Sequence, residues 1–265
     1  MRVTGLGLGT DLALIALRGK VVDRGDYLVA TTPDDPGYFY GNLLVLPPPM
    51  RAGDLAGLLA LFARELGGEP ELRHVTFCWD GVLDDPAAVV ELTAAGFEVE
   101  TTQVMTATAF PAIAAPPDIE VRPLSPDELV RTVELDFPAH GDPEAQRRFL
   151  HRRAAWQRDL VARGRARFWG AFSAHALVGS LGLVKLGRLG RYQDVQTAAS
   201  HRRRGIASAL LSAAARDALA GGVEQLVIMT DVGGDAARVY QRVGFRVAEH
   251  TASACRKPRR DAPTS

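Results

Sequence analysis

The sequence has 265 residues, of which 47% are hydrophobic and 23% are charged. This composition is typical of a folded globular protein and excludes a disordered or fibrous one. Its 31 Lys and Arg residues balance 31 Asp and Glu residues, so the formal net charge is zero. The chain as a whole therefore has no electrostatic attraction to nucleic acid or to an anionic membrane, and any anion site must be local. This length accommodates one large domain or two small ones.

The cysteines and the N-terminal segment favour a reducing, cytoplasmic setting. Cys78 and Cys255 are too few for a disulfide scaffold and form no Cys-x-x-Cys pair. The apolar stretch Leu12–Leu17 lies between Asp11 and Arg18. It is too short to cross a membrane, which takes roughly 20 apolar residues. We therefore expect a cytoplasmic protein with neither a membrane nor a nucleic acid as its partner.

The first half of the chain has alternating strand and helix patterns. Near its start, Gly5-x-Gly7-x-Gly9 resembles a dinucleotide fingerprint only in spacing, because no strong strand precedes it. Thr10 or Asp11 as a helix N-cap explains this segment. The elements predicted next are strands at Tyr27–Thr32 and Tyr38–Leu46, a helix at Asp54–Leu66, a strand at His74–Asp80, a helix at Pro86–Ala95 and a strand at Phe97–Ala107.

The second half follows a Pro- and Ala-rich segment, Phe110–Asp118, which is the expected linker. Strands come first and then alternate with helices, which predicts a mixed sheet with helices on its faces. The predicted strands are Ile119–Pro123, Arg167–Ser173, Ala176–Lys185, Tyr192–Ala198, Gln225–Asp231 and Phe245–Ala254. The predicted helices are Ser125–Phe137, Asp142–Arg163, Gly205–Ala220 and Asp235–Val243.

The two halves share a landmark that indicates a duplicated fold. The segment Ala87–Glu100, AAVVELTAAGFEVE, parallels Ala236–Glu249, AARVYQRVGFRVAE. Each segment follows a strand-like run that ends in Asp, and in each a Gly-Phe pair closes the helix. Because the order of the elements also matches, we expect two tandem domains, residues 1–115 and 116–265.

The most specific pattern is a basic loop between a predicted strand and a helix. It carries three consecutive arginines and Gly205, directly before an Ala- and Leu-rich helix. Unpaired N–H groups at a helix start bind anions, glycine accepts a positive φ, and arginine donates two hydrogen bonds to a phosphate. The alternative is a basic loop at an ordinary helix start. The combination of strand, loop and helix favours phosphate binding.

Arg202-x-x-Gly205-x-Ala207 resembles the Q/R-x-x-G-x-G/A motif of the GCN5-related N-acetyltransferases (GNAT). The stretch Ala236–Phe245 resembles the next motif of that family. Ala207 stands where glycine is usual, and Gly233 stands where the family often has Asn. The resemblance implies an α/β fold in which each domain has a central mixed, mostly antiparallel sheet flanked by helices. It also implies acetyl-CoA as the acetyl donor. The cofactor-binding residues that it implies are Val195, Gln196, Thr197, Arg202, Arg203, Arg204, Gly205, Ile206, Ala207, Ala236 and Tyr240.

Acetyl transfer from a thioester to an amine needs a base for the amine and a donor to the leaving sulfur. By motif, Tyr240 is the candidate donor, and we expect hydrogen bonding because its ordinary pKa exceeds that of a thiol. The alternative is a packed aromatic side chain. Asp194 is the first candidate base and acceptor-site residue, but it could instead hold Arg191 or cap a turn. His140 is a weaker candidate for the acceptor site, since a loop histidine beside Gly and Asp is often solvated.

The first half lacks both parts of this chemistry. Its corresponding helix start, Pro47–Asp54, is rich in prolines, which have no N–H, and Leu92 aligns with Tyr240. We therefore expect a degenerate copy that packs, shapes the acceptor cleft or supports a homodimer. The sequence has no metal-binding motif. The predicted function is acetyl transfer to a primary amine, with a small molecule as acceptor. The alternatives are a protein amine as acceptor and a non-catalytic acyl-CoA-binding or regulatory module.

Overall fold

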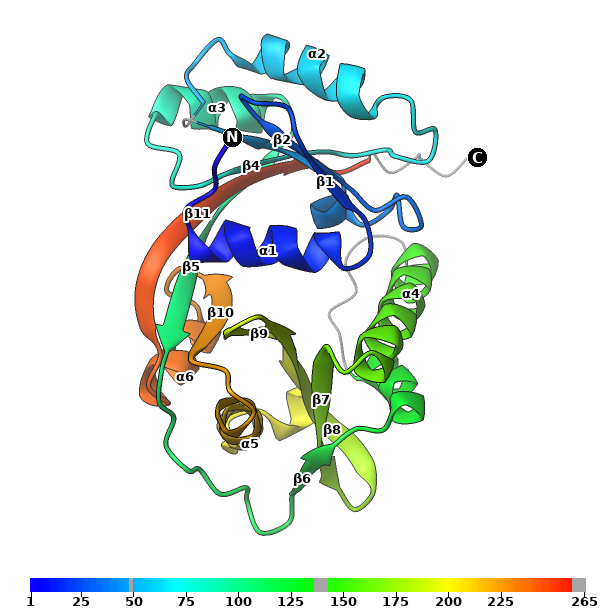
Figure 1. The fold of residues 1–265 in the computed structure, drawn as a ribbon, viewed down its shortest axis with the longest axis vertical. Helices are drawn as coiled ribbons and strands as arrows, with labels where there is room; N and C mark the ends of the chain where they lie inside the picture. The colour runs from blue at the N-terminus through cyan, green and yellow to red at the C-terminus, as the bar shows by residue number, and fades with distance from the viewer. Residues whose placement is uncertain (48–49, 136–142, 259–265) are drawn as a thin grey trace. The chain divides into compact units, whose positions relative to one another are not determined.

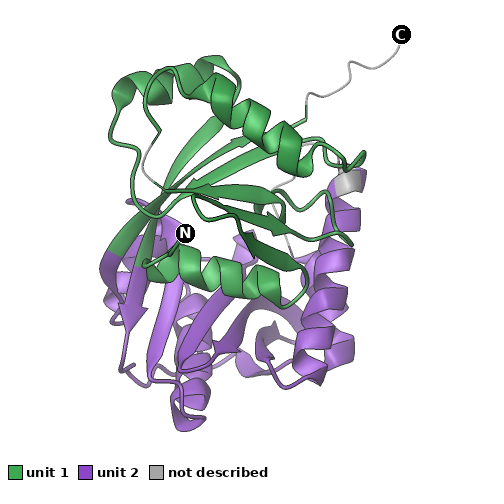
Figure 2. Cartoon of the chain, turned by 45° about the horizontal axis from the view of Figure 1, so that its top comes forward, with its two compact units in different colours: residues 1–104, 249–265 green, residues 105–248 purple. Residues whose placement is uncertain are grey.

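The structure is a computed structural model that describes residues 1–47, 50–135 and 143–258. The chain divides into two compact units, unit 1 with residues 1–104 and 249–265 and unit 2 with residues 105–248 (Figure 2). Both divisions fall inside a strand, β5 (Glu98–Ala107) and β11 (Arg246–Arg256), so each of these strands has residues in both units. The divisions lie away from residue 115 because they follow strand pairing, whereas the Pro-rich linker marks only a change in local composition.

Unit 1 is a mixed sheet with helices on both faces (Figure 1). Its strand order is β1-β2-β3-β4-β11-β5. The pairs β1–β2, β2–β3 and β4–β11 are antiparallel, whereas β3 and β4 are parallel. Helices α2 and α3 pack on one face and α1 packs on the other. The further elements are α1 (Leu6–Ala16), β1 (Lys20–Asp23), β2 (Leu28–Thr31), the 3-10 helix η1 (Phe39–Gly41), β3 (Leu43–Leu46), α2 (Leu55–Leu66), β4 (Val75–Trp79) and α3 (Pro86–Ala94).

The helix α1 begins earlier than the sequence suggested. Its N-cap is Gly5, so the expected N-cap at Thr10 or Asp11 is wrong. The Asp80 carboxylate accepts the backbone N–H of Gly5 at 3.0 Å, and the Glu249 carboxylate accepts that of Gly7 at 2.6 Å. A Cβ on Gly5 would lie 2.2 Å from Asp80 Oδ1. The glycines therefore let two carboxylates reach the positive end of the helix, an arrangement that no local pattern reveals.

Unit 2 repeats the plan. Its strand order is β10-β9-β8-β7-β6, with β5 beside β10. The pairs β6–β7, β7–β8 and β8–β9 are antiparallel, whereas β9 and β10 are parallel. Helices α5 and α4 lie on opposite faces of these strands (Figure 1). The further elements are β6 (Glu120–Pro123), the 3-10 helix η2 (Pro126–Glu134), α4 (Pro143–Ala162), β7 (Ala166–Ser173), β8 (Ala176–Leu186), β9 (Leu189–Thr197), the 3-10 helix η3 (Ala199–His201), α5 (Ile206–Ala220), β10 (Gln225–Asp231) and α6 (Asp235–Arg242).

The core of unit 2 fixes α5 against the sheet. Ile206, Leu210 and Leu211 are buried against the apolar side chains of the strands. A Cβ on Gly179 of β8 would lie 3.2 Å from Ile206 Cγ2, so the glycine allows the helix to approach closely. The Tyr192 hydroxyl donates to the Leu211 carbonyl at 2.9 Å and ties β9 to the same helix. The N-terminus of α5 is thereby held at the end of β9.

Two tandem units, each with a mixed and mostly antiparallel sheet flanked by helices, confirm the predicted fold. Two predicted elements were wrong in type. The strand expected at Tyr38–Leu46 is η1 followed by a shorter strand, and the helix expected at Ser125–Phe137 is the 3-10 helix η2. Ser125 and Glu128 do form a capping box there, so the start signal was correct. No helix in the described part of the chain is long and apolar enough to cross a membrane.

A buried polar group in unit 1 makes the stability of this unit depend on pH. His74 is 2% exposed, and its Nε2 lies 3.1 Å from the Asn42 carbonyl oxygen. Burial lowers the pKa of His74 below its ordinary value, against the opposing effect of this carbonyl. Asn42 is itself buried and donates to Thr32 Oγ1 at 3.0 Å. Burial in this network therefore disfavours the protonated, charged form of His74.

We expect the free energy of unfolding to fall as the pH drops from about 7.5 to about 5, since the unfolded chain takes up a proton near pH 6.5 that folded His74 resists. Urea titrations at several pH values measure this dependence. His74→Gln removes that contribution, and its pH slope should be shallower than the slope of the wild type. His151→Gln, at an exposed position on α4, is the control and should leave the slope unchanged. Equal slopes for wild type and His74→Gln would contradict the assignment.

Candidate functional site

In unit 2 the two parallel strands β9 and β10 stop pairing before they end. Their last pair is Arg191 with Val227, although β9 continues to Thr197 and β10 to Asp231. Beyond this pair, no strand among the described residues pairs with the edge of β9 that faces β10. Backbone polar groups left without a partner need another hydrogen-bonding group. Val195, Gln196 and Thr197 of the predicted set lie on this part of β9.

The predicted phosphate loop joins the end of β9 to α5. Gly205 is the N-cap of α5, with φ of 82°, and no atom lies within 4 Å of a Cβ built on it. The first intrahelical bond runs from Ala209 N–H to the Gly205 carbonyl at 3.0 Å. Within the described residues, no acceptor is recorded for the N–H groups of Ile206 and Ala207. These amides lie at the start of the helix, where the partial positive charge favours the binding of an anion.

The three loop arginines differ in their surroundings. Arg202 donates through Nε to the Thr197 carbonyl at 3.2 Å, which ties the loop to the end of β9. Arg204 is paired with Asp118 at 2.6 Å, and it holds the pKa of that carboxyl below its ordinary value. The side chain of Arg203 is exposed, and its backbone has φ of 61°. A phosphate at the loop would therefore meet Arg203 directly and would compete with Asp118 for Arg204.

Tyr240 lies on α6 in the packed core of unit 2. It is 6% exposed, and its ring stacks edge-on against Phe245 with centroids 6.1 Å apart. Burial raises its pKa to about 12. Its hydroxyl forms no hydrogen bond with the described residues, yet it is not among the polar atoms sealed from solvent. The hydroxyl of Tyr192, by contrast, is taken by Leu211. Ala236, on the same helix as Tyr240, is partly buried against this core.

Asp194 occupies an irregular point of β9. Gly182 of β8 pairs with Gln193 and Ser180 pairs with Gln196, so Leu181 faces two residues, Asp194 and Val195, and β9 bulges. Asp194 has φ of 51°, a left-handed conformation that costs a non-glycine residue about 1–3 kcal/mol. The sequence offered only a weak signal for this bulge, which is that Asp tolerates positive φ better than most residues.

The Asp194 side chain contacts α4 rather than the predicted Arg191. Its Oδ1 accepts Arg153 Nη1 at 2.8 Å, and its Oδ2 accepts Gln157 Nε2 at 2.6 Å. The Oε1 atoms of Gln157 and Gln196 are buried without a hydrogen-bond partner in the described part of the chain. Sequence reasoning missed Arg153 and Gln157, because their spacing on a polar helix resembles that of a solvated face. The acceptor-site candidate His140 lies outside the described residues.

The corresponding place in unit 1 is already filled by the protein's own groups. Pairing of β3 with β4 continues to Leu46 and Trp79, the last residues of both strands. Before α2, the backbone N–H groups donate to carboxylates, from Arg51 to Asp54, from Ala52 to Asp85 and from Gly53 to Glu91, at 2.8–3.1 Å. Leu92 is fully buried. Three amides of the loop before α2 are therefore already bound by the protein's own carboxylates.

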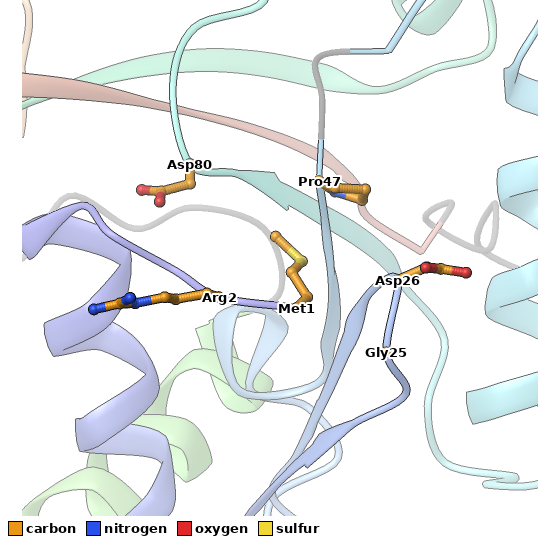
Figure 3. A pocket seen from close by; sticks show the side chains of 6 residues that line it. All are labelled: Met1, Arg2, Gly25, Asp26, Pro47 and Asp80. Carbon is orange, nitrogen blue, oxygen red and sulfur yellow. The ribbon is translucent and has the colours of Figure 1, made fainter.

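Two hollows in unit 1 contain none of the predicted site residues. One, of about 400 Å³, lies where β3 and β4 end, and Figure 3 shows the residues that line it, Met1, Arg2, Gly25, Asp26, Pro47 and Asp80. Asp80 faces this hollow but is already engaged with the start of α1. The other, of about 660 Å³, is lined by residues of α3 and β5 and by Leu83. Among the described residues, no cluster of His, Cys, Asp and Glu could hold a metal ion.

Comparison with known proteins finds a family match in the second half of the chain. Residues 137–254 match the model of the acetyltransferase (GNAT) domain. No curated protein sequence matches the chain. A GCN5-related N-acetyltransferase from Kribbella flavida is similar in structure, with a TM-score of 0.63, 15% identity and 97% of each chain covered. A conserved protein of unknown function from Staphylococcus epidermidis gives a TM-score of 0.70 and 12% identity over 92% of this chain and 96% of its own.

A tandem GNAT protein from the clavulanic acid biosynthesis pathway is also similar in structure. It matches with a TM-score of 0.54 and 17% identity, over 83% of this chain and 74% of its own. At such identities the likeness establishes the fold alone. The family match runs through β10 and α6 into β11, so the predicted recognition of a GNAT domain is confirmed for the half that carries the open loop.

The conformation of Gly205 yields a prediction for binding of CoA. Gly205→Ala forces a side chain into φ of 82° and should displace the first amides of α5, weakening CoA binding by about tenfold or more. Gly187→Ala is a matched control, since Gly187 has φ of 64°, also has no atom within 4 Å, and lies in the β8–β9 turn. Both variants should lose about 1 kcal/mol of stability. Calorimetric titration with CoA separates them, and equal affinities would show that the loop does not bind CoA.

Proposed function

We propose that this chain, whose residues 137–254 belong to the acetyltransferase (GNAT) family, transfers an acetyl group from acetyl-CoA to a primary amine of a small molecule. The observation that carries the proposal is the pair of open backbone surfaces in unit 2, the start of α5 and the edge of β9 beyond Arg191. The transfer is direct within a ternary complex, because neither cysteine lies in the motifs. Cys78 and Cys255 are both buried in unit 1.

In this proposal the phosphate loop holds the pyrophosphate of acetyl-CoA. The amides of Ile206 and Ala207 and the side chain of Arg203 provide donors, and Gly205 sets the turn that presents them. Arg202 keeps the loop attached to β9, and Arg204 exchanges Asp118 for phosphate. The pantetheine arm then pairs with the free edge of β9 at Val195–Thr197, as an added strand would. Ala236 on α6 leaves room beside that arm.

The reacting groups meet where β9 and β10 separate. The amine nitrogen attacks the thioester carbon, the C–N bond forms as the C–S bond breaks, the amine loses one proton and the CoA thiolate becomes a thiol. Negative charge grows first on the carbonyl oxygen, where the amide edge of β9 donates to it. Tyr240, with a pKa of about 12, is a poor acid toward a thiolate whose ordinary value is about 8.5. It therefore stabilises the leaving sulfur by a hydrogen bond.

The base for the amine stays a prediction. Asp194 is the carboxylate at the bulge, and each of its oxygens holds one donor while keeping further lone pairs. Asp194 can therefore accept a proton directly or through water, in competition with Arg153 and Gln157 for its oxygens. The acceptor role of His140 and the cytoplasmic location also stay predictions. A small-molecule acceptor remains our first choice over a protein amine.

We further propose that the first half is a degenerate copy. Carboxylates from Asp54, Asp85 and Glu91 accept three backbone amides of the loop before α2, which opposes an anionic ligand there, and Leu92 stands at the position that aligns with Tyr240. Its strands β3 and β4 remain paired to their ends, which leaves no open edge for a pantetheine arm. Acetyl-CoA binding by the full chain should therefore saturate at one molecule per chain.

The direct test is release of CoA thiol from acetyl-CoA in the presence of a panel of primary amines, followed by mass spectrometry of the product. A gain of one acetyl group on an amine supports the proposal. The second candidate, a non-catalytic acyl-CoA-binding module, is favoured by the deep packing of Tyr240, and it predicts binding without turnover on any amine. Failure of both acetyl-CoA and CoA to bind would contradict both functions.

Tyr240→Phe should lower kcat by about 10- to 100-fold while leaving acetyl-CoA affinity and thermal stability close to wild type, because the hydroxyl has no bond within the described residues to lose. Tyr192→Phe is the opposite case. It removes the hydrogen bond to Leu211, so it should cost about 1 kcal/mol of stability and leave kcat almost unchanged. Kinetics and thermal unfolding of both variants measure this contrast. A Tyr240→Phe enzyme with wild-type kcat would remove Tyr240 from the mechanism.

A further inference from the structure

The bulge of β9 is held by a clamp from α4. Asp194 has a left-handed backbone at the bulge, and both of its carboxylate oxygens are bound by α4, through Arg153 at 2.8 Å and Gln157 at 2.6 Å. Arg153 and Gln157 lie four positions apart, which places them on one face of the helix. The clamp thus joins an irregular point of the strand to a regular element of twenty residues.

The clamp comes at the expense of another hydrogen bond. Gln157 is 2% exposed, and with its Nε2 turned to Asp194 its Oε1 has no partner in the described residues. Reversing the amide would place Oε1 against the carboxylate, so the observed orientation is the only one that binds Asp194. A buried amide oxygen without a partner is uncommon and unfavourable. Packing alone does not explain why α4 has a glutamine at this place.

The bulge lies next to the free edge of β9. Asp194 directly precedes Val195, and the pairing of β9 with β10 has already ended at Arg191. The backbone angles of Asp194 therefore set the direction in which the following amides point. A donor displaced by a fraction of an ångström loses much of its effect on a growing negative charge, because such donors act only when they are fixed in advance.

We propose that Asp194 is a positioning residue, whose carboxylate is clamped by Arg153 and Gln157 so that the bulge aims the amide edge of β9 at the acetyl carbonyl. This inference rests on the proposed acetyl transfer and assigns Asp194 a role other than that of the base. The clamp acts through the backbone, so a side chain that keeps the bulge should keep the rate, whether or not it can accept a proton.

Three variants of Asp194 separate the backbone from the charge. Asp194→Asn keeps the shape, the tolerance of positive φ and one of the two acceptor oxygens, and should lower kcat less than the other two variants do. Asp194→Gly keeps the backbone conformation but loses the clamp, and should lower kcat by about tenfold or more. Asp194→Ala loses both the backbone conformation and the clamp, and its kcat should be lower still. Gln157→Leu, which acts from α4, should lower kcat in the same direction as Asp194→Gly.

A spectroscopic measurement needs no acceptor amine. The ¹³C resonance of acetyl-CoA labelled at the carbonyl carbon reports how strongly donors polarise the bound carbonyl. In the wild type and in Asp194→Asn it should lie downfield of the resonance of free acetyl-CoA. In Asp194→Gly and Gln157→Leu it should move back toward the free value, while acetyl-CoA still binds. Arg163→Met, which breaks the exposed Arg163–Asp159 pair on the same helix, is the control and should match wild type.

The pH profile of kcat distinguishes positioning from base catalysis. A positioning role predicts that Asp194→Asn retains the acidic limb of the wild-type profile. Loss of that limb, together with a fall of about 100-fold in Asp194→Asn, would overturn the inference in favour of a base. Wild-type kcat and carbonyl resonance in Asp194→Gly would overturn it as well, while leaving the proposed function intact. A wild type that neither binds nor turns over acetyl-CoA would overturn both.

Discussion

The site in unit 2 depends on one constraint, the early end of pairing between two parallel strands. Pairing of β9 with β10 stops at Arg191 and Val227, and the backbone of β9 beyond that point needs partners from elsewhere. In unit 1 the equivalent strands, β3 and β4, pair to their last residues, Leu46 and Trp79. One unit thus leaves a strand edge open where the other closes it, and we propose that this difference allows an extended ligand to bind to unit 2 alone.

Helix starts show the same contrast. In unit 1 the amides before α2 and at the start of α1 are bound by internal carboxylates, those of Asp54, Asp85, Glu91, Asp80 and Glu249. In unit 2 the amides of Ile206 and Ala207, the first of α5, have no acceptor among the described residues, and the exposed Arg203 belongs to the same loop. A protein anion and a ligand anion satisfy such amides equally well. We infer that the chain retains one anion site because the other copy supplies its own anions.

The sequence predicted what local patterns encode. Gly205 beside three arginines and the Gly-Phe pairs at Gly96 and Gly244 are short signals, and they led to the family, the tandem fold and the loop. Features that depend on distant partners were missed. The helix start at Gly5 is bound by the distant carboxylates of Asp80 and Glu249, and Arg153 contacts Asp194 at a bulge of β9. The assignment of residues to units also depended on strand pairing, since β11 completes unit 1 with residues from the end of the chain.

The central claim is that acetyl-CoA lies along the open edge of β9 with its pyrophosphate on the start of α5. A crystal structure of the full chain with acetyl-CoA tests it most directly. We expect density for the pyrophosphate within hydrogen-bonding distance of the amides of Ile206 and Ala207, and for the acetyl group beside Val195, in unit 2 alone. Density for the nucleotide in the hollow at Asp80 of unit 1, or a pantetheine arm away from β9, would contradict the claim.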